Sequence, residues 1–441
     1  MLEKLAEKIS KIAPKWEIMM EEAQISHLKY EGAKIKSIKD INASGICARI
    51  IKDGTLGFAY STDFENVDLF CEHLKGSLAY GQKADYEFSS SLSIGNEKIN
   101  CYDPLVADLS KEEMIKLGDK SVDHFCSLIS NVELNLYLGK ALATHYFLNS
   151  KGLSFKEKRS AFSMFFDSQF VEDDNILEIA EARSSAFIDL NPEEMVANLL
   201  KKYKDIKHTA RLDSKKIPVI FTPEASEVLM LPLIMGFNGK NIALKTSPLS
   251  EKEGQKIFDP RLTLIDDGLA SGTAYSSRFD HEGFPRSKKY LIKEGQISNF
   301  LLNLETAKQL NKENTGNGCR GSFGSWDGAS FPSVSPTILK VNPGQLEFSK
   351  MLSNMQEGLL VDSVLGLGQG NVISGDFSLN VLLAYLVKNG EIAGRVKNVM
   401  ISGNAYDILK DIDEIGKDVL WEKDDLVVPH IQSSRVSIVT E

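Results

Sequence analysis

The residues best suited to chemistry lie in one glycine-rich stretch, residues 265–321. The stretch holds two acidic loops, whose candidate side chains are Asp266, Asp267, Asp280, His281 and Glu282. Side chains gathered in this way could ligate a metal, polarise water or recognise a peptide amine. Acidic side chains in turns also bond to nearby backbone amides or face solvent, and no histidine pair accompanies these acids. The spacing alone leaves both interpretations open.

The rest of the chain lacks the short motifs that assign a reaction by themselves. Metal hydrolysis is typical of paired histidines beside a glutamate, whereas the seven histidines here are scattered singly. There is no G-x-S-x-G, no phosphate-binding loop and no G-x-G-x-x-G, and the five cysteines form no C-x-x-C pair. Ser374 and Asp376 resemble a nucleophile loop, but a turn feeding a strand at 379–386 is the favoured interpretation.

Length and charge limit the classes of protein that fit. A chain of 441 residues is too long for one simple core. A strand pattern restarts at 217–221, so we place a boundary near 209–216 and expect domains over 1–210 and 211–441. The net charge of −10, without a long Lys/Arg block, disfavours a nucleic-acid partner.

The apolar runs are short. The most apolar, 228–237, contains Pro232 and is far below the roughly 20 residues that a membrane-spanning helix needs. Charged residues interrupt the helical pattern at the N-terminus, which argues against a secretory signal. We therefore expect a cytoplasmic protein without membrane contact.

Hydrophobic periodicity predicts an α+β fold, with a mixed N-terminal domain and a β-rich, mostly antiparallel C-terminal domain carrying a few helices. Three segments with the same pattern each predict a tight hairpin turn: IIKDGTL, LIKEGQI and LVKNGEI. Capping patterns at 110–113 and 191–194 each open a helix. The other predicted elements are strands at 17–23 and 35–41, a helix at 63–84, a polar linker at 87–100, a β meander at 131–170, and helices near 223–236, 345–357 and 405–415.

Taken together, these residues resemble the TldD/PmbA family, cytosolic proteins linked to metallopeptidase activity and once called modulators of DNA gyrase. The resemblance covers nearly the whole chain. Its specific motifs are FDHEGFP at 279–285, TGNG at 315–318 with Arg320, ISGDFS at 373–378 and ISGN at 401–404.

The family has two branches that resemble partners. In the TldD branch, a helix carries H-E-x-x-x-H and a later cysteine completes a zinc site. The corresponding segment here reads LPLIMG at 231–236, so leucine, proline and glycine stand where the first histidine, the glutamate and the second histidine are expected. No cysteine follows Cys319. The resemblance therefore implies the PmbA (TldE) branch, with no metal or cofactor in this chain and zinc in a TldD-type partner.

The function that this resemblance implies is a non-catalytic subunit of a cytosolic TldD-type zinc peptidase complex that degrades or matures small peptides. A homodimer is also allowed, because two similar subunits would offer pseudo-symmetric faces. The residues expected to contact peptide or partner are Asn317, Arg320, Ser374 and Asp376. One alternative is a stand-alone peptidase with a relocated site in the loops at 266–282, and another is a regulator of DNA gyrase.

Overall fold

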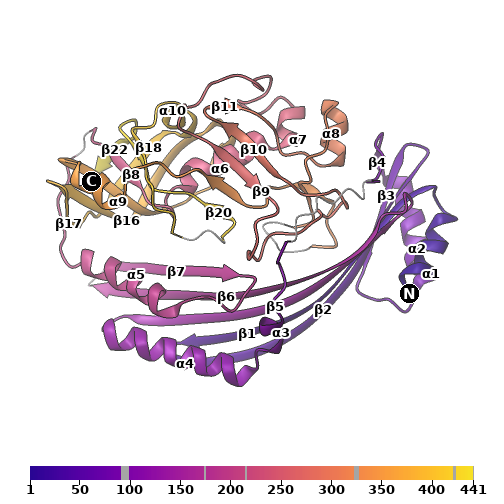
Figure 1. Ribbon diagram of the computed structural model, residues 1–441, viewed down its shortest axis with the longest axis horizontal. Coiled ribbons are helices and arrows are strands. Elements are labelled where there is room, and N and C mark those ends of the chain that lie inside the picture. Colours follow the sequence, from indigo (N-terminus) through magenta and orange to yellow (C-terminus); the bar gives the residue numbers. More distant parts are fainter. Residues whose placement is uncertain (91–98, 173–174, 214–215, 322–326, 421–423, 441) are drawn as a thin grey trace.

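Long antiparallel strands build the N-terminal half of the computed structural model, which describes residues 1–90, 99–172, 175–213, 216–321, 327–420 and 424–440 (Figure 1). They form a seven-stranded sheet of order β4-β3-β2-β1-β5-β6-β7. Its strands are β1 (Lys15–Glu31), β2 (Lys34–Lys52), β3 (Thr55–Ser61), β4 (Gln82–Lys83), β5 (Glu133–Asn149), β6 (Ser154–Glu172) and β7 (Asn175–Ser185). β1 and β2 are much longer than the predicted strands at 17–23 and 35–41, because their pairing continues beyond the apolar residues.

The three hairpin turns with the shared Lys-x-Gly pattern have the same backbone geometry. Asp53 and Gly54 have φ angles of 51° and 74°, and Asn389 and Gly390 have 51° and 83°. The turn at 294–295 is similar, with φ of 49° and 80°. Two consecutive left-handed residues match the twist of the flanking strands, which explains the repeated Lys-x-Gly pattern.

Helices cover both ends of this sheet (Figure 1). α1 (Leu2–Ser10) and α2 (Val67–Ser77) pack at one end, and α4 (Lys111–Leu128) and α5 (Pro192–Asp205) at the other, with the short α3 (Pro104–Asp108) between. The predicted capping box at Ser110 and the Asn191 N-cap are both present. The helix predicted at 63–84 is shorter, because Asn66 caps α2 and a 3₁₀ turn follows it at Leu78–Tyr80. Of the predicted linker at 87–100, residues 91–98 lie outside the described residues, as do 214–215 of the predicted boundary.

The C-terminal half contains a five-stranded and an eight-stranded sheet. Among the described strands, the pairs are antiparallel except β8–β15 and β14–β20, so the predicted α+β class is confirmed. The elements are β8 (Val219–Phe221), α6 (Glu227–Phe237), α7 (Gly239–Ala243), β9 (Leu264–Asp267), β10 (Lys288–Lys293), β11 (Gln296–Ile297), α8 (Leu304–Leu310), β12 (Gly318–Cys319), β13 (Ser333–Val334), β14 (Leu339–Val341), α9 (Phe348–Ser353), β15 (Glu357–Leu365), a 3₁₀ turn (Val372–Ser374), β16 (Asp376–Lys388), β17 (Glu391–Arg395), β18 (Val399–Asn404), α10 (Ala405–Lys410), β19 (Glu414–Ile415), β20 (Leu426–Val427), β21 (Ile431–Ser433) and β22 (Ser437–Thr440).

The two halves share a hydrophobic core. Leu136 and Phe166 of the long sheet lie in one buried cluster with Leu360 and Tyr385 of β15 and β16. The predicted division after residue 210 stays a prediction. Within the described parts of the chain, every helix is too short or too polar to cross a bilayer.

The capping box of α4 gives a test of how this helix is held. Its Ser110 hydroxyl accepts a hydrogen bond from the amide of Glu113, whose carboxylate accepts one from the amide of Ser110. We expect Ser110→Ala to lower the free energy of unfolding by about 1 kcal/mol, because the first helical turn loses an acceptor. Urea denaturation of the variant and the wild type measures this difference in the free energy of unfolding. Ser127→Ala, at the other end of α4, is the matched control, and an equal loss there would contradict the capping role.

Candidate functional site

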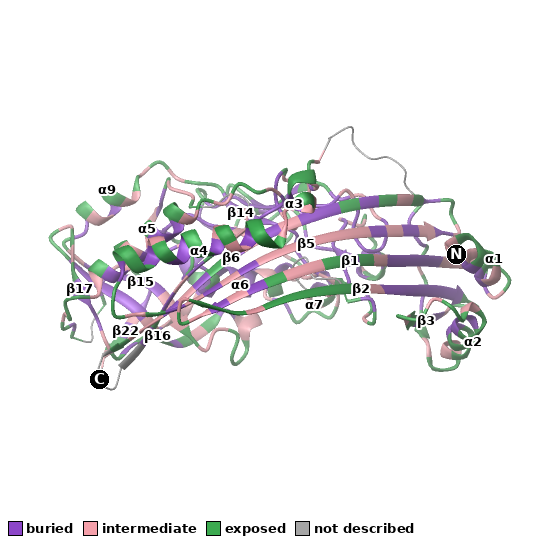
Figure 2. Cartoon of the chain, turned by 90° about the horizontal axis from the view of Figure 1, so that it is seen from below, coloured by how far each residue is buried: buried purple, intermediate pink, exposed green. Residues whose placement is uncertain are grey.

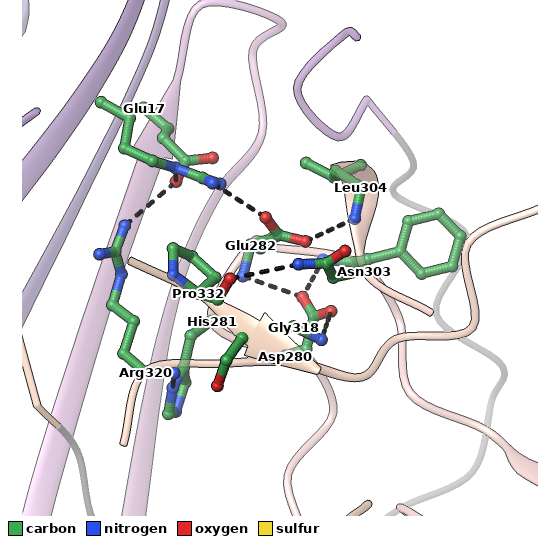
Figure 3. A network of polar contacts seen from close by, with 12 residues as sticks. Glu17, Asp280, His281, Glu282, Asn303, Leu304, Gly318, Arg320 and Pro332 are labelled. Carbon is green, nitrogen blue, oxygen red and sulfur yellow. Dashed lines mark hydrogen bonds and ion pairs between the residues drawn. The ribbon is translucent and has the colours of Figure 1, made fainter. Parts of the chain in front are cut away.

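A buried ion-pair network joins the long sheet to the acidic loops of the C-terminal half (Figure 3). The Arg49 guanidinium on β2 lies 2.7 Å from a Glu17 carboxylate oxygen on β1 and 2.9 Å from one of Glu282. Arg320 lies 3.6 Å from the same Glu17 oxygen. All four side chains are buried. Because an unpaired buried charge is costly, this network holds the loop at 280–284 against β1 and β2.

Backbone amides use the remaining oxygens of the loop acids. Glu282 accepts a hydrogen bond of 2.7 Å from the amide of Leu304, the first residue of α8. Asp280 accepts from the amides of Glu282, Phe284 and Gly318 at 2.9, 2.8 and 2.9 Å. A Cβ at position 318 would lie 2.5 Å from a Glu282 oxygen, so glycine is needed there for close approach.

His281 serves as a hydrogen-bond acceptor in the same loop. Its Nδ1 accepts a hydrogen bond of 2.8 Å from the amide of Arg320, and its own amide donates to the carbonyl of Gly318 at 2.8 Å. Burial, followed by the neighbouring His145 and nearby arginines, lowers the pKa of His281 well below its usual value. The imidazole is therefore neutral, as an acceptor nitrogen requires.

Asp266 and Asp267 lie on β9, in a second network. Asp266 is fully buried and accepts hydrogen bonds from Lys289 at 2.9 Å and Asn317 at 2.7 Å. The amides at 337 and 338 bond to its other oxygen. Burial opposes the charge of Asp266, but Lys289 and these donors outweigh it and lower its pKa. Asp267 lies 3.5 Å from Lys340.

The five acidic-loop candidates therefore do not converge on one open position. Asp280 is bonded to backbone amides, and Glu282 to an amide and to Arg49. Asp266 is bonded to a lysine and to an amide side chain. In the described residues there is no group of three or more His, Cys, Asp or Glu side chains that could hold a metal ion. Of the predicted contact residues, Asn317 and Arg320 are buried within these networks.

Helix α6 tests whether the segment that resembles the zinc helix fits a metal. Leu231 and Pro232 offer no nitrogen or oxygen side-chain donor. A Cβ at Gly236 would lie 2.5 Å from the Tyr406 hydroxyl, which donates to the carbonyl of Pro232 at 2.9 Å. Tyr406 thus occupies the space that a side chain at position 236 would need, and the zinc site implied by the family does not fit this helix.

A cavity beside α6 brings Leu231 and Pro232 next to Ser374 and Asp376. Its volume is ≈ 700 Å³. The Ser374 hydroxyl donates to an Asp376 carboxylate oxygen at 2.9 Å, and Asn404 donates to the other at 2.8 Å. The Asn404 bond comes first among the causes that lower the pKa of Asp376. The Ser374 turn leads directly into β16, as the favoured interpretation predicts.

Sequence patterns missed the partners supplied by the long sheet. Arg49 lies inside an apolar run at 46–51, where every residue is buried. Glu17 likewise precedes three apolar residues, 18–20, on β1. A single charge inside such a run signals a buried ion pair, because desolvation forbids burying it alone. The partner of Arg49 in the C-terminal half, Glu282, is however more than 230 residues away in the chain.

Removing Arg49 tests this network. Burial, with repulsion from Asp280, raises the pKa of Glu282 to about 7 against the pull of Arg49. We expect Arg49→Met to lower the free energy of unfolding by about 3–5 kcal/mol at pH 8, because Glu17 and Glu282 lose their shared cation. An acid with a raised folded-state pKa favours the folded state at low pH, and this contribution is lost as the pH rises from 4.5 through 7.

The loss of unfolding free energy caused by Arg49→Met should therefore be smaller at pH 5, where Glu282 is protonated. Urea denaturation at both pH values measures it. Arg435→Met, which breaks an exposed pair with Asp411, is the control and should cost nothing measurable. A deficit that is independent of pH would show that packing, and not charge, explains the loss.

Comparisons with known proteins agree with this architecture. The PmbA/TldA metallopeptidase C-terminal domain matches residues 214–440, and the PmbA/TldA metallopeptidase domain 1 matches 16–75. A metalloprotease of Methanocaldococcus jannaschii is 25% identical over 434 residues, covering 95% of this chain and 92% of that protein. Metalloprotease PmbA of Escherichia coli O157:H7 is 27% identical over 324 residues, covering 71% and 67%.

A solved structure extends the likeness to the fold. The crystal structure of TldE from Thermococcus kodakarensis superposes with a TM-score of 0.89 at 22% identity, covering 99% of each chain. The C-terminal domain match alone spans just over half of the sequence. The chain therefore belongs to the PmbA/TldD metallopeptidase family.

Proposed function

We propose that this chain is a non-catalytic, PmbA-type subunit of a cytosolic TldD-type zinc metallopeptidase complex that acts on small peptides. Helix α6 carries the proposal, because apolar residues and a glycine occupy the positions that correspond to the zinc ligands and the general base. The Tyr406 hydroxyl fills the remaining space at Gly236. Zinc and the hydrolytic step would then reside in the partner subunit.

The cavity beside α6 supports a retained binding role. It keeps the polar pair Ser374 and Asp376 opposite the apolar Leu231 and Pro232. Ser374 is half-buried and Asp376 is exposed, so we propose these two for contact with peptide or partner. For the buried Asn317 and Arg320 we propose a positioning role, since the Asn317 side chain bonds to Asp266 and the Arg320 guanidinium lies beside Glu17 of β1.

Reconstitution tests the subunit role. A TldD-type subunit carrying H-E-x-x-x-H should cleave unstructured peptides faster when mixed with this chain than when assayed alone. The partner variant with Gln in place of the motif glutamate should be inactive in the mixture, because the general base is lost there. Equal cleavage by the TldD-type subunit with and without this chain would contradict the proposal.

The rival function is a stand-alone peptidase, favoured by the name of the Escherichia coli relative, Metalloprotease PmbA. Zinc analysis separates the two. We expect far less than one zinc per chain in protein purified without a histidine tag, because neither α6 nor the acidic loops gathers metal ligands among the described residues. About one bound zinc per chain, as a single-metal catalytic site requires, would favour the rival.

A further inference from the structure

A second cavity lies between the long sheet and the loops of the C-terminal half. Its volume is ≈ 660 Å³, within the usual range for small-molecule sites. β1, β2, β5 and β6 form its floor, and Ala274, Asp327 and Gly328 line it from the C-terminal half. It shares no lining residue with the cavity beside α6.

Strand register explains why this floor is hollow. Ala43, Ala23, Ala143 and Arg159 are directly opposite one another on β2, β1, β5 and β6. Directly paired residues share one face of a sheet, so three alanines form a shallow trough that ends at the arginine. The next row is also apolar, and its side chains become smaller from β2 to β6. It consists of Ile41, Ile25, Ala141 and Ala161.

The trough is open at one end and buried at the other. Among the described strands, β3 pairs with β2 only from Ile46 onward, so residues 34–45 of β2 lie at an edge of the described sheet. Figure 2 shows β2 along the edge of the sheet, exposed over much of its length. Ala43 is exposed, Ala143 is half-buried and Arg159 is buried. The row crosses three strand spacings of about 4.8 Å, from β2 to β6. This distance equals the length of roughly four residues of extended peptide.

Arg159 is a buried cation at the closed end of the trough. It is only 8% exposed, and its guanidinium donates a hydrogen bond to the carbonyl of Ala274. In the described part of the chain it forms no ion pair, because the nearby Glu157 bonds to Arg278 at 3.0 Å. Burial lowers the pKa of Arg159; attraction by Glu157 opposes this, and repulsion from Arg286 adds to it.

The neighbouring acid is also engaged. Glu21 lies one row from Arg159 and contacts the His145 imidazole. A buried guanidinium has five donors in a planar fork, which matches a carboxylate held by two parallel hydrogen bonds. The donors that remain after the Ala274 contact are therefore suited to an incoming anion.

We propose that this trough binds the C-terminal end of a short extended peptide, with the Arg159 guanidinium pairing with the peptide's α-carboxylate. The alanine row accommodates a slender main chain, and the open β2 edge lets the peptide enter. This assignment builds on the peptide-handling role proposed above. It is tested on this chain alone, so its failure and the failure of the partner role can be told apart.

Calorimetric titration of the full chain tests the proposal. The probes are N-acetyl-tetra-alanine with a free C-terminal carboxylate, the same peptide as its carboxamide, and acetate. We expect the acid to bind at least about tenfold more tightly than the amide, because only the acid forms the charge-assisted pair. Equal binding of acid and amide, or no binding of the acid, would overturn the proposal. Acetate binding as tightly as the peptide acid would assign the site to small carboxylates instead and also overturn it.

Two variants locate the site. Arg159→Gln should lose the preference for acid over amide, and Ala143→Leu should weaken binding of the acid by filling the trough while leaving Arg159 in place. Arg261→Gln, whose guanidinium pairs with Asp259 in the C-terminal half, is the matched arginine control and should bind as the wild type does. Thermal melting checks that each variant is folded. If Arg159→Gln does not fold, Ala143→Leu decides, and unchanged binding in that variant refutes the site.

Discussion

The contact of Arg49 with Glu17 and Glu282 is the interaction on which the described site depends. One guanidinium balances two carboxylates from opposite halves of the chain, all away from water. Separating the two halves would leave these charges buried without partners or require them to be rehydrated. The position of the loop at 280–284 follows from this constraint. So does the glycine at 318, because its backbone must approach the Glu282 carboxylate closely.

Charge pairing also describes how the cluster of acids in the loops is used within the fold. Asp266, Asp280 and Glu282 share their oxygens among amides, Lys289 and Arg49, so each carboxylate is already paired within the fold. A catalytic or metal-binding carboxylate must instead keep an oxygen available for substrate or ion. The available surface lies elsewhere, at the cavity beside α6 and at the trough of alanines on the long sheet.

The trough shows how one sheet can supply both stability and a binding surface. Alternation directs large side chains such as Phe162 and Phe166 toward the α4 and α5 side, where they form the core. On the other face, alanines at paired positions leave space below the C-terminal loops. Arg159 stands at the end of that space because it pairs with Ala143 in the sheet register. Its strand neighbour Glu157 is bonded to Arg278 instead of to Arg159.

The sequence by itself determined the local features of this protein. The Asp53-Gly54 turn, the Ser110 capping box and the Asn191 N-cap follow from residue types a few positions apart, whose interactions are decided within one turn or hairpin. The absence of histidine and glutamate at positions 231, 232 and 236 of α6 can likewise be read directly from the sequence. Only the tertiary structure decided which partners meet. The pairing of Arg49 with Glu282, the position of Tyr406 against Gly236 and the alignment of Ala23, Ala43 and Ala143 with Arg159 depend on strand register and on contacts between distant segments. Such contacts leave no local periodicity in the chain, because the free energy that selects them comes from burial and charge pairing across the assembled fold.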